Sequence, residues 1–261
     1  FHNDPLTMKG SISIKERKNL LNKCEKIIFN SKWCQSRFTK NLNTSNYENK
    51  TIVIPQSTSK VKINFKDKKK IISFVGKLNT SKGYDSFGKA ILKILNEYPE
   101  WYSIVIGDER REKHIFKHKR LKILGFRSNK FILNKLKDVS ISVVPSKWDE
   151  PFGRSSLEAS SRGCALITSD KGGLTETTKD SIVISNVNEH SIYKKIKLLI
   201  NNVKMRNNLQ KKTYKNFFLT NKYVTKLIDD LRESIILKTS RIDFAKKLKI
   251  LHVTNLNERF D

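Results

Sequence analysis

Short apolar runs alternate with amphipathic stretches from residue 71 to residue 218 of the chain. The apolar runs are bounded by Gly, Pro and polar clusters, a pattern that predicts buried strands. We expect strands at residues 71–76, 102–107, 122–126, 139–144, 165–168 and 181–184. Strands that alternate with helices in this way are typical of an α/β fold with a doubly wound parallel sheet.

The stretches between the runs carry the signal of helices. Between residues 85 and 98, apolar side chains recur at helical spacing and predict an amphipathic helix. Further helices are expected at residues 128–136, directly after the segment 150–158, and at residues 189–202, 204–218 and 221–239.

The first part of the chain follows a weaker version of the same pattern. We expect short strands at residues 26–30 and 51–55, and helices at residues 13–24 and after the N-cap residue Ser31. Residues 1–5 resemble the end of a strand that runs into a loop. The polar stretch 56–70 is the best candidate for an interdomain linker.

These elements divide the chain into four parts. We assign residues 1–60 to the C-terminal remnant of one domain, 61–220 to a Rossmann-type domain, 221–246 to a C-terminal helix and linker, and 247–261 to the start of a following Rossmann-type domain. The last part has a basic lead-in, an apolar run and a polar loop, and a C-terminal tail strand is the alternative. Because the sequence opens with Phe1, we expect it to be an excerpt of a longer protein.

The net charge of the chain indicates which class of partner it binds. The chain has 53 Lys and Arg against 25 Asp and Glu, a formal net charge of +28. Such an excess indicates a phosphate-rich partner: a nucleotide, a nucleic acid or an anionic membrane. The alternative is compositional bias, because the Lys residues are scattered and do not form one block. We therefore expect weak peripheral contact with an anionic membrane, and no nucleic acid as partner.

Cysteine usage and hydropathy favour a cytoplasmic protein that is at most peripheral to the inner membrane face. The three cysteines, Cys24, Cys34 and Cys164, are odd in number and lack C-x-x-C spacing, which is typical of free thiols in a reducing compartment. No signal peptide is visible, and no apolar run approaches the roughly 20 residues that a membrane span needs.

The loop at residues 76–83 is the first candidate for chemistry. It follows a predicted strand, precedes a predicted helix and contains Gly76, Lys77, Lys82 and Gly83. Backbone N–H groups at the helix start and two ammonium groups would converge on an anion such as a diphosphate. The spacing is neither that of a P-loop nor that of a dinucleotide-binding fingerprint. A solvated loop in a Lys-rich protein is the alternative.

Residues 150–158 are the second candidate, at the carboxyl end of a predicted parallel strand, where open α/β sheets bind ligands. Glu150 stands before Pro151 in a loop and can accept hydrogen bonds from vicinal hydroxyls of a sugar. The N–H groups that would point into the same space belong to Phe152, Gly153, Arg154 and Ser155. Glu158 has an ordinary structural explanation, because Ser155 and Glu158 match an S-x-x-E capping box.

The histidines do not predict a metal site. His114 and His118 are four residues apart, but the sequence shows no third ligand, so we expect no zinc and no other metal. His2, followed by Asn3 and Asp4, lies at a predicted strand end, where a surface or packed histidine is the commoner case. No Ser-His-Asp or Cys-His signature is recognisable.

Taken in order, these motifs resemble the retaining, nucleotide-sugar-dependent glycosyltransferases of the GT-B fold, the large E-x7-E or glycosyl transferases group 1 family. The family's E-P-F-G-x-x-x-x-E motif matches residues 150–158. Its G-R-L segment with a following K-G matches residues 76–83, with Lys77 in place of Arg, and its G-G-x-x-E turn matches residues 172–176. The resemblance covers residues 71–218 and, more weakly, residues 1–56, where it implies the end of an acceptor domain.

The resemblance also implies roles for individual residues. Lys77 and Lys82 would neutralise the donor diphosphate and stabilise it as a leaving group, in the loop that begins at Gly76. Glu150 would hold hydroxyls of the transferred sugar, and Glu158 would bind the ribose. The further implied contacts are Gly125 and Phe126 near the base, the amides of residues 152–155 around sugar and phosphate, and His2 on the sugar from the other domain. Lys77 keeps the charge of the family's Arg but loses its bidentate fork.

The implied reaction is transfer of a glycosyl group from a nucleoside-diphosphate sugar to an acceptor hydroxyl, with retained anomeric configuration and without metal or cofactor. Its acceptor would be a glycan, a lipid-linked or a small molecule, in glycan, lipopolysaccharide or capsule synthesis. One alternative is a basic Rossmann-like binding module for nucleic acid or anionic membrane, without catalysis. Another is an inactive transferase-like scaffold, which the retained pairs of Glu and Lys residues disfavour.

Overall fold

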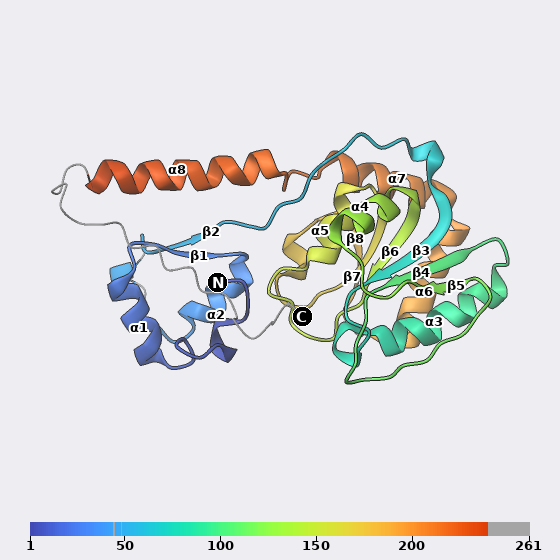
Figure 1. Ribbon diagram of the computed structural model, residues 1–261, viewed down its shortest axis with the longest axis horizontal. Helices are drawn as coiled ribbons and strands as arrows, with labels where there is room; N and C mark the ends of the chain where they lie inside the picture. The colour runs from blue at the N-terminus through green and yellow to red at the C-terminus, as the bar shows by residue number, and fades with distance from the viewer. Residues whose placement is uncertain (44, 48, 240–261) are drawn as a thin grey trace. The chain divides into compact units, whose positions relative to one another are not determined.

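A computed structural model describes residues 1–43, 45–47 and 49–239 of the chain (Figure 1). The chain forms two compact units. One comprises Phe1–Ser57 together with the described part of the segment that begins at Leu219, and the other comprises Thr58–Phe218. Residues 247–261, which the sequence assigns to the start of a further domain, lie outside the described residues.

The Thr58–Phe218 unit contains a six-stranded sheet with the order β5-β4-β3-β6-β7-β8. Its strands are β3 (Lys69–Val75), β4 (Tyr102–Ile106), β5 (Leu121–Ile123), β6 (Val139–Val144), β7 (Ala165–Ser169) and β8 (Ser181–Ile184). All neighbouring strands pair in parallel. The strand order reverses between β3 and β6, and doubly wound sheets bind their ligands at this switch point.

Helices cover both faces of this sheet (Figure 1). They are α3 (Tyr84–Glu97), α4 (Asn129–Asp138), α5 (Arg154–Ser161), α6 (Glu189–Asn201) and α7 (Val203–Lys215), with 3-10 turns at Phe65–Asp67, Thr80–Lys82 and Gly173–Glu176. One hydrophobic core lies between the sheet and helices α3 and α6, and another lies between the sheet and helices α4 and α5.

The central strands serve both cores, because successive side chains of a strand point to opposite faces. In β3, Ile72 and Phe74 belong to the core under α3 and α6, whereas Ile71 and Val75 pack against the core under α4 and α5. Strand β6 is buried along its whole length. Burial on both faces explains why these strands read as continuous apolar runs in the sequence.

The other unit contains a two-stranded parallel sheet. Its elements are β1 (Ile27–Phe29), β2 (Thr51–Val53), α1 (Ile14–Lys23), α2 (Lys32–Thr39), α8 (Asn221–Thr239) and 3-10 turns at Pro5–Thr7 and Ser45–Tyr47. Ser13 caps α1 in a capping box with Glu16, and Ser31 caps α2 as the sequence predicts. Helix α8 packs through Val224 and Leu231 on Ile54.

Two element predictions need correction. The strand predicted at residues 122–126 ends at Ile123, because Gly125 turns the chain with φ of +68°. Residues 1–5 form no strand in the structure. Phe1 nevertheless lies along β1, since its N-terminal amine donates to the carbonyl of Ile28 and its carbonyl accepts from the N–H of Asn30.

Candidate functional site

The loops after β3, β6 and β7 meet at the carboxyl edge of the sheet. The first of them spans residues 76–83, and the second leads from the end of β6 to Gly153. After β7, Gly172 forms a parallel bridge with Glu150, and the N–H of Gly173 donates to the Glu150 carbonyl at 2.6 Å. Three motifs that are far apart in the sequence are therefore neighbours here.

Glu150 and Lys82 form an ion pair in this cluster. The ammonium of Lys82 donates to both carboxylate oxygens of Glu150, at 2.6 and 2.8 Å. Glu150 is only 7% exposed, and a buried carboxylate without a partner is strongly unfavourable. The sequence assigned Lys82 to a diphosphate and Glu150 to a sugar. The structure joins these two side chains in one ion pair.

The loop at residues 76–83 packs closely against the loop after β6. Gly83 adopts φ of +73°, and a Cβ atom there would lie 2.0 Å from the carbonyl oxygen of Pro145. The carbonyl of Ser81 accepts hydrogen bonds from the N–H groups of Lys147 and Trp148, at 2.9 and 3.0 Å. Only glycine fits at this approach, which brings the turn that carries Lys82 to the sheet edge.

Asn79 fixes the direction of that turn. Its side-chain oxygen accepts hydrogen bonds from the N–H of Lys82 at 3.0 Å and from the hydroxyl of Ser81 at 2.9 Å. Lys77 lies exposed earlier in the same loop, after Gly76. Sequence reasoning missed Asn79, although an Asn three residues before Lys82 is a typical N-cap signal.

The start of α5 differs from the sequence interpretation. Its N-cap residue is Gly153, with φ of +103°, and no side chain caps the helix. The predicted capping box of Ser155 and Glu158 is therefore wrong. The Ser155 hydroxyl donates to the carbonyl of Val75 at 2.7 Å instead. No side chain therefore accepts from the first N–H groups of α5, and uncapped helix starts of this kind suit an anion. The ring of Phe152, just before this helix, is buried.

Glu158 is held by the first residue of α4. The amide of Asn129 donates to Oε1 of Glu158 at 2.6 Å, and the guanidinium of Arg154 lies 3.3 Å from the same oxygen. Burial raises the pKa of Glu158, and the charge of Arg154 and the hydrogen bond from Asn129 act against this rise. Sequence reasoning missed Asn129, because no local spacing connects it with Glu158.

Gly125 and Phe126 lie in the loop after β5, beyond the end of the strand. The carbonyl of Gly125 accepts a hydrogen bond from the N–H of Gly107 at 2.9 Å. The ring of Phe126 is 75% exposed. An exposed aromatic ring of this kind offers a flat face on which a nucleobase can stack.

His2 belongs to the Phe1–Ser57 part of the chain, whereas the other predicted site residues belong to the Thr58–Phe218 unit. Its ring Nδ1 lies 3.3 Å from the amide nitrogen of Gln56, and its carbonyl accepts from the amide of Asn30 at 3.1 Å. The contact of His2 with a sugar stays a prediction.

The described residues contain neither a metal-binding cluster nor a membrane-spanning helix. They include no group of three or more His, Cys, Asp or Glu side chains that could hold a metal ion. His114, considered above as a ligand with His118, lies 3.0 Å from Glu112 and 3.2 Å from the hydroxyl of Thr80. Across residues 1–43, 45–47 and 49–239, no helix has the length and apolar character of a membrane span.

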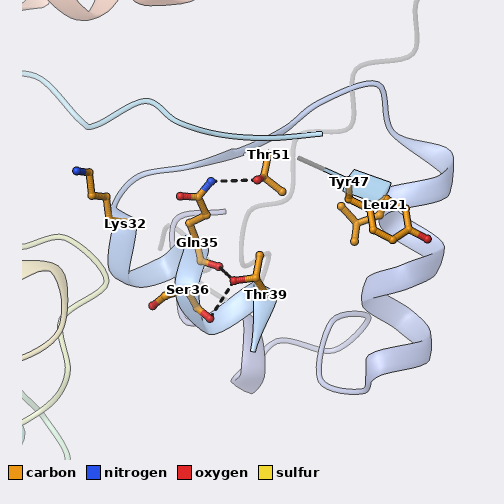
Figure 2. Close-up of a pocket in the computed structure, with 7 residues that line it drawn as sticks. All are labelled: Leu21, Lys32, Gln35, Ser36, Thr39, Tyr47 and Thr51. Carbon is orange, nitrogen blue, oxygen red and sulfur yellow. Dashed lines mark hydrogen bonds between the residues drawn. The ribbon is translucent and has the colours of Figure 1, made fainter. Parts of the chain in front are cut away.

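A separate cavity of about 330 Å³ lies in the Phe1–Ser57 part (Figure 2). It is lined by Leu21, Lys32, Gln35, Ser36, Thr39, Tyr47 and Thr51. Figure 2 shows the amide of Gln35 donating to the hydroxyl of Thr51, at 3.0 Å, and the hydroxyl of Thr39 donating to the Gln35 carbonyl. Much of the polar lining is thus bonded internally, and none of the predicted site residues lines this cavity.

A comparison with family models decides the affiliation of the chain. The model of the glycosyl transferases group 1 matches residues 55–216, which is more than half of the chain. The chain belongs to this glycosyltransferase family. The family predicted from the motifs is confirmed, and the matched segment contains every predicted site residue except His2.

Two relatives are similar to part of the chain. An uncharacterized 42.6 kDa protein in the cps region of Klebsiella pneumoniae is 32% identical over 112 residues, which are 42% of this chain and 29% of the relative. The putative glycosyltransferase YtcC of Bacillus subtilis is 29% identical over 49% of this chain and 35% of its own length. The matched part therefore spans about a third of these relatives.

Solved structures agree with the fold of the chain. Anabaena Alr3699/HepE, crystallised in complex with UDP-glucose, has a TM-score of 0.71 at 17% identity, over 89% of this chain and 71% of that one. Sucrose-phosphate synthase from Thermosynechococcus elongatus has a TM-score of 0.70 at 14% identity, over 91% and 67% of the two chains. The predicted GT-B-like α/β fold is confirmed.

Proposed function

We propose that this glycosyltransferase moves a sugar from a nucleoside-diphosphate sugar to an acceptor hydroxyl, with retained anomeric configuration. The observation that carries the proposal is the ion pair of the buried Glu150 with Lys82, beside the uncapped start of α5. A carboxylate that accepts from hydroxyls, an ammonium and a helix N-terminus in one cluster suit a ligand made of a sugar and a diphosphate.

The diphosphate would be bound by Lys77, Lys82 and the first amides of α5. Positive charge at this position stabilises the negative charge that develops on the leaving group as the glycosidic bond breaks. Two lysines and a helix N-terminus supply this charge without a divalent cation, so we propose that the transfer needs no metal and no cofactor. Activity in the presence of EDTA tests this point, and its complete loss would contradict it.

The sugar would sit against Glu150, which accepts hydrogen bonds from its hydroxyls. In the transfer, the bond between the anomeric carbon and the β-phosphate oxygen breaks, and a bond from the acceptor oxygen to the same carbon forms on the same face. The acceptor proton passes to the departing phosphate oxygen. The transition state has oxocarbenium character, and His2 would contact the sugar from the other part of the chain.

The nucleoside would extend toward the α4 and β5 side of the site. Glu158, oriented by Asn129, would accept from the ribose hydroxyls, and the exposed ring of Phe126 beside Gly125 would stack on the base. A related fold was crystallised with UDP-glucose, so UDP-sugars are the first donors to test. The location of one relative in a cps region is the basis for proposing an acceptor in polysaccharide synthesis. We place the transfer on the cytoplasmic side of the membrane as part of the same proposal.

Donor turnover by the full chain tests the proposal. UDP-, GDP- and ADP-sugars are offered in turn, and release of the nucleoside diphosphate is measured. We expect Glu150→Gln to lower turnover at least a hundredfold, because the hydrogen bonds to the sugar change where charge develops. Lys93→Ala, which breaks an exposed ion pair with Glu189, is the matched control and should leave turnover unchanged. Equal turnover by the wild type and Glu150→Gln would contradict the proposal.

A further inference from the structure

The connection between β4 and β5 has an unusual form. Residues 107–120, which we call the strap, contain no helix, although parallel strands are usually joined through one. The strap runs along α3 (Figure 1). A Cβ atom on Gly88 would lie 2.0 Å from a ring carbon of Phe116, so the ring occupies the space above this glycine. The same ring meets the ring of Tyr84 edge-on, with 5.5 Å between the centroids. The strap is therefore seated on α3 by a specific contact.

The first half of the strap contacts the loop at residues 76–83. The N–H of Leu78 donates to the carbonyl of Asp108 at 3.2 Å. The amide nitrogen of Asn79 donates to the carboxylate of Glu109 at 3.1 Å, which leaves the Asn79 oxygen directed at the N–H of Lys82. Glu109 thus determines which way the Asn79 amide faces, and Asn79 in turn caps the turn that carries Lys82.

Glu112 makes a second connection to the same loop. One oxygen of its carboxylate accepts from both the N–H and the hydroxyl of Thr80, each at 2.8 Å. His114 lies 3.0 Å from this oxygen and 3.2 Å from the Thr80 hydroxyl. The first residue of the 3-10 turn Thr80–Lys82 is therefore held from the strap.

Both carboxylates are ionised at neutral pH. The hydrogen bonds from Arg111 and Asn79 lower the pKa of Glu109 to about 2, and those from Thr80 lower the pKa of Glu112. The guanidinium of Arg111 forms an ion pair with Glu109 at 3.0 Å, so the negative charge left behind the loop is mainly that of Glu112. A negative charge behind a loop that attracts an anion weakens that attraction. Its presence therefore calls for a compensating benefit, and the geometry supplies one.

We propose that Glu109 and Glu112 of the strap are positioning residues of the donor site, which hold the turn Thr80–Lys82 so that the Lys82 ammonium points at the carboxyl edge of the sheet. This inference rests on the proposed function. The two roles of the carboxylates predict opposite results. If they acted by charge alone, their removal would strengthen diphosphate binding, whereas a positioning role predicts that their removal weakens it.

Calorimetric titration of the full chain with UDP, GDP and ADP tests the inference. We expect Glu112→Ala to bind the preferred diphosphate about tenfold more weakly than the wild type, because Thr80 and the turn lose their acceptor. Glu112→Gln keeps an acceptor oxygen without the charge and should bind within about twofold of the wild type. Glu109→Ala should weaken binding in the same direction.

Glu97→Ala is the matched control. Glu97 also accepts from two partners, Tyr193 and Lys197, but it ends α3, about 20 Å along the helix from Tyr84. If Glu112→Ala binds as tightly as Glu97→Ala, or more tightly than the wild type, the inference is overturned. Failure of Glu112→Gln to restore affinity would also overturn it, and thermal unfolding confirms that each variant is folded. If the wild type binds none of the three diphosphates, the proposed function fails instead.

Discussion

At the scale of single residues, the site depends on carboxylates whose partners come from other loops. Glu150 is neutralised by Lys82, 68 residues away, and Glu158 is oriented by Asn129, 29 residues away. Each carboxylate is almost fully buried. Because burial makes a charged carboxylate unfavourable, the partners determine how much each carboxylate costs in folding free energy and where it points in the site.

Removal of Lys82 should destabilise the protein as well as weaken donor binding. Lys82→Met leaves the Glu150 carboxylate buried without its cation. Since the Lys82 side chain keeps 31% exposure, we expect a loss of about 2 kcal/mol in the free energy of unfolding, below the cost for a fully buried pair. The double variant Lys82→Met/Glu150→Gln should recover most of this loss in urea denaturation. Strict additivity of the two substitutions would show that the pair is not coupled.

Glu158 should lower the free energy of unfolding in alkaline solution, where its carboxylate is charged, and not in acidic solution. Burial raises the pKa of Glu158 above its ordinary value of 4.5. The folded state then binds more protons than the unfolded state, so the contribution of Glu158 is fully present below 4.5 and is lost as pH rises through the folded pKa. We expect Glu158→Gln to be more stable than the wild type at about pH 8 and no more stable at about pH 4. Urea unfolding at both values checks this, and an advantage at the lower pH would contradict it.

At the scale of elements, close backbone contacts between loops place the site at the switch point of the sheet. The 3-10 turn Thr80–Lys82 touches the loop after β6 through Gly83 and Pro145. Behind it, the strap holds Asn79 and Thr80. The loop that carries the lysines is thus supported from both sides before any ligand binds.

Gly83→Ala should disrupt the contact between this loop and the loop after β6, and should cost more stability than Gly10→Ala, which has similar backbone strain. Gly83 and Gly10 both have positive φ, of +73° and +91°, but a Cβ atom meets the Pro145 carbonyl at the first and nothing within 4 Å at the second. We expect Gly10→Ala to cost about 1 kcal/mol and Gly83→Ala about 3 kcal/mol in free energy of unfolding, with at least tenfold weaker donor binding only for Gly83→Ala. Thermal denaturation and calorimetry provide the comparison, and equal effects of the two variants would contradict it.

At the scale of the whole molecule, the net charge of +28 should produce a salt-sensitive attraction to anionic surfaces. Ile12 and Ile14 are 54% and 42% exposed near the start of α1, with exposed Lys9 and Lys15 beside them. We expect flotation with phosphatidylglycerol vesicles that falls at least tenfold between about 0.05 and about 0.5 M salt.

Lys9→Ala/Lys15→Ala should weaken this flotation, whereas Glu150→Gln should leave flotation unchanged and lower turnover at least a hundredfold. The two readouts separate a transferase with peripheral membrane contact from a basic binding module without catalysis. Vesicle binding without any donor turnover by the wild type would favour the second. Flotation that does not respond to salt would contradict the electrostatic account.

The element pattern of the Thr58–Phe218 unit could be predicted because its signals are local. The strand predicted at 139–144 and the strand predicted at 181–184 match β6 and β8. The strand predicted at 122–126 ends at Ile123 in the structure, because Gly125 takes a positive φ that the apolar run does not predict. The capping box at Ser155 and Glu158 was wrong for a similar reason: both side chains found partners outside α5.

The sequence by itself determined the order of elements, the family and the residues around which a donor site could form, because hydrophobic period and motif spacing are properties of neighbouring residues. Only the tertiary structure decided that Lys82 pairs with Glu150, that Asn129 orients Glu158, and that the strap supports the turn Thr80–Lys82. These contacts follow from the strand order and from backbone approaches at the carboxyl edge. They join segments that are far apart in the sequence, and separation along the chain does not predict which segments lie close together in space.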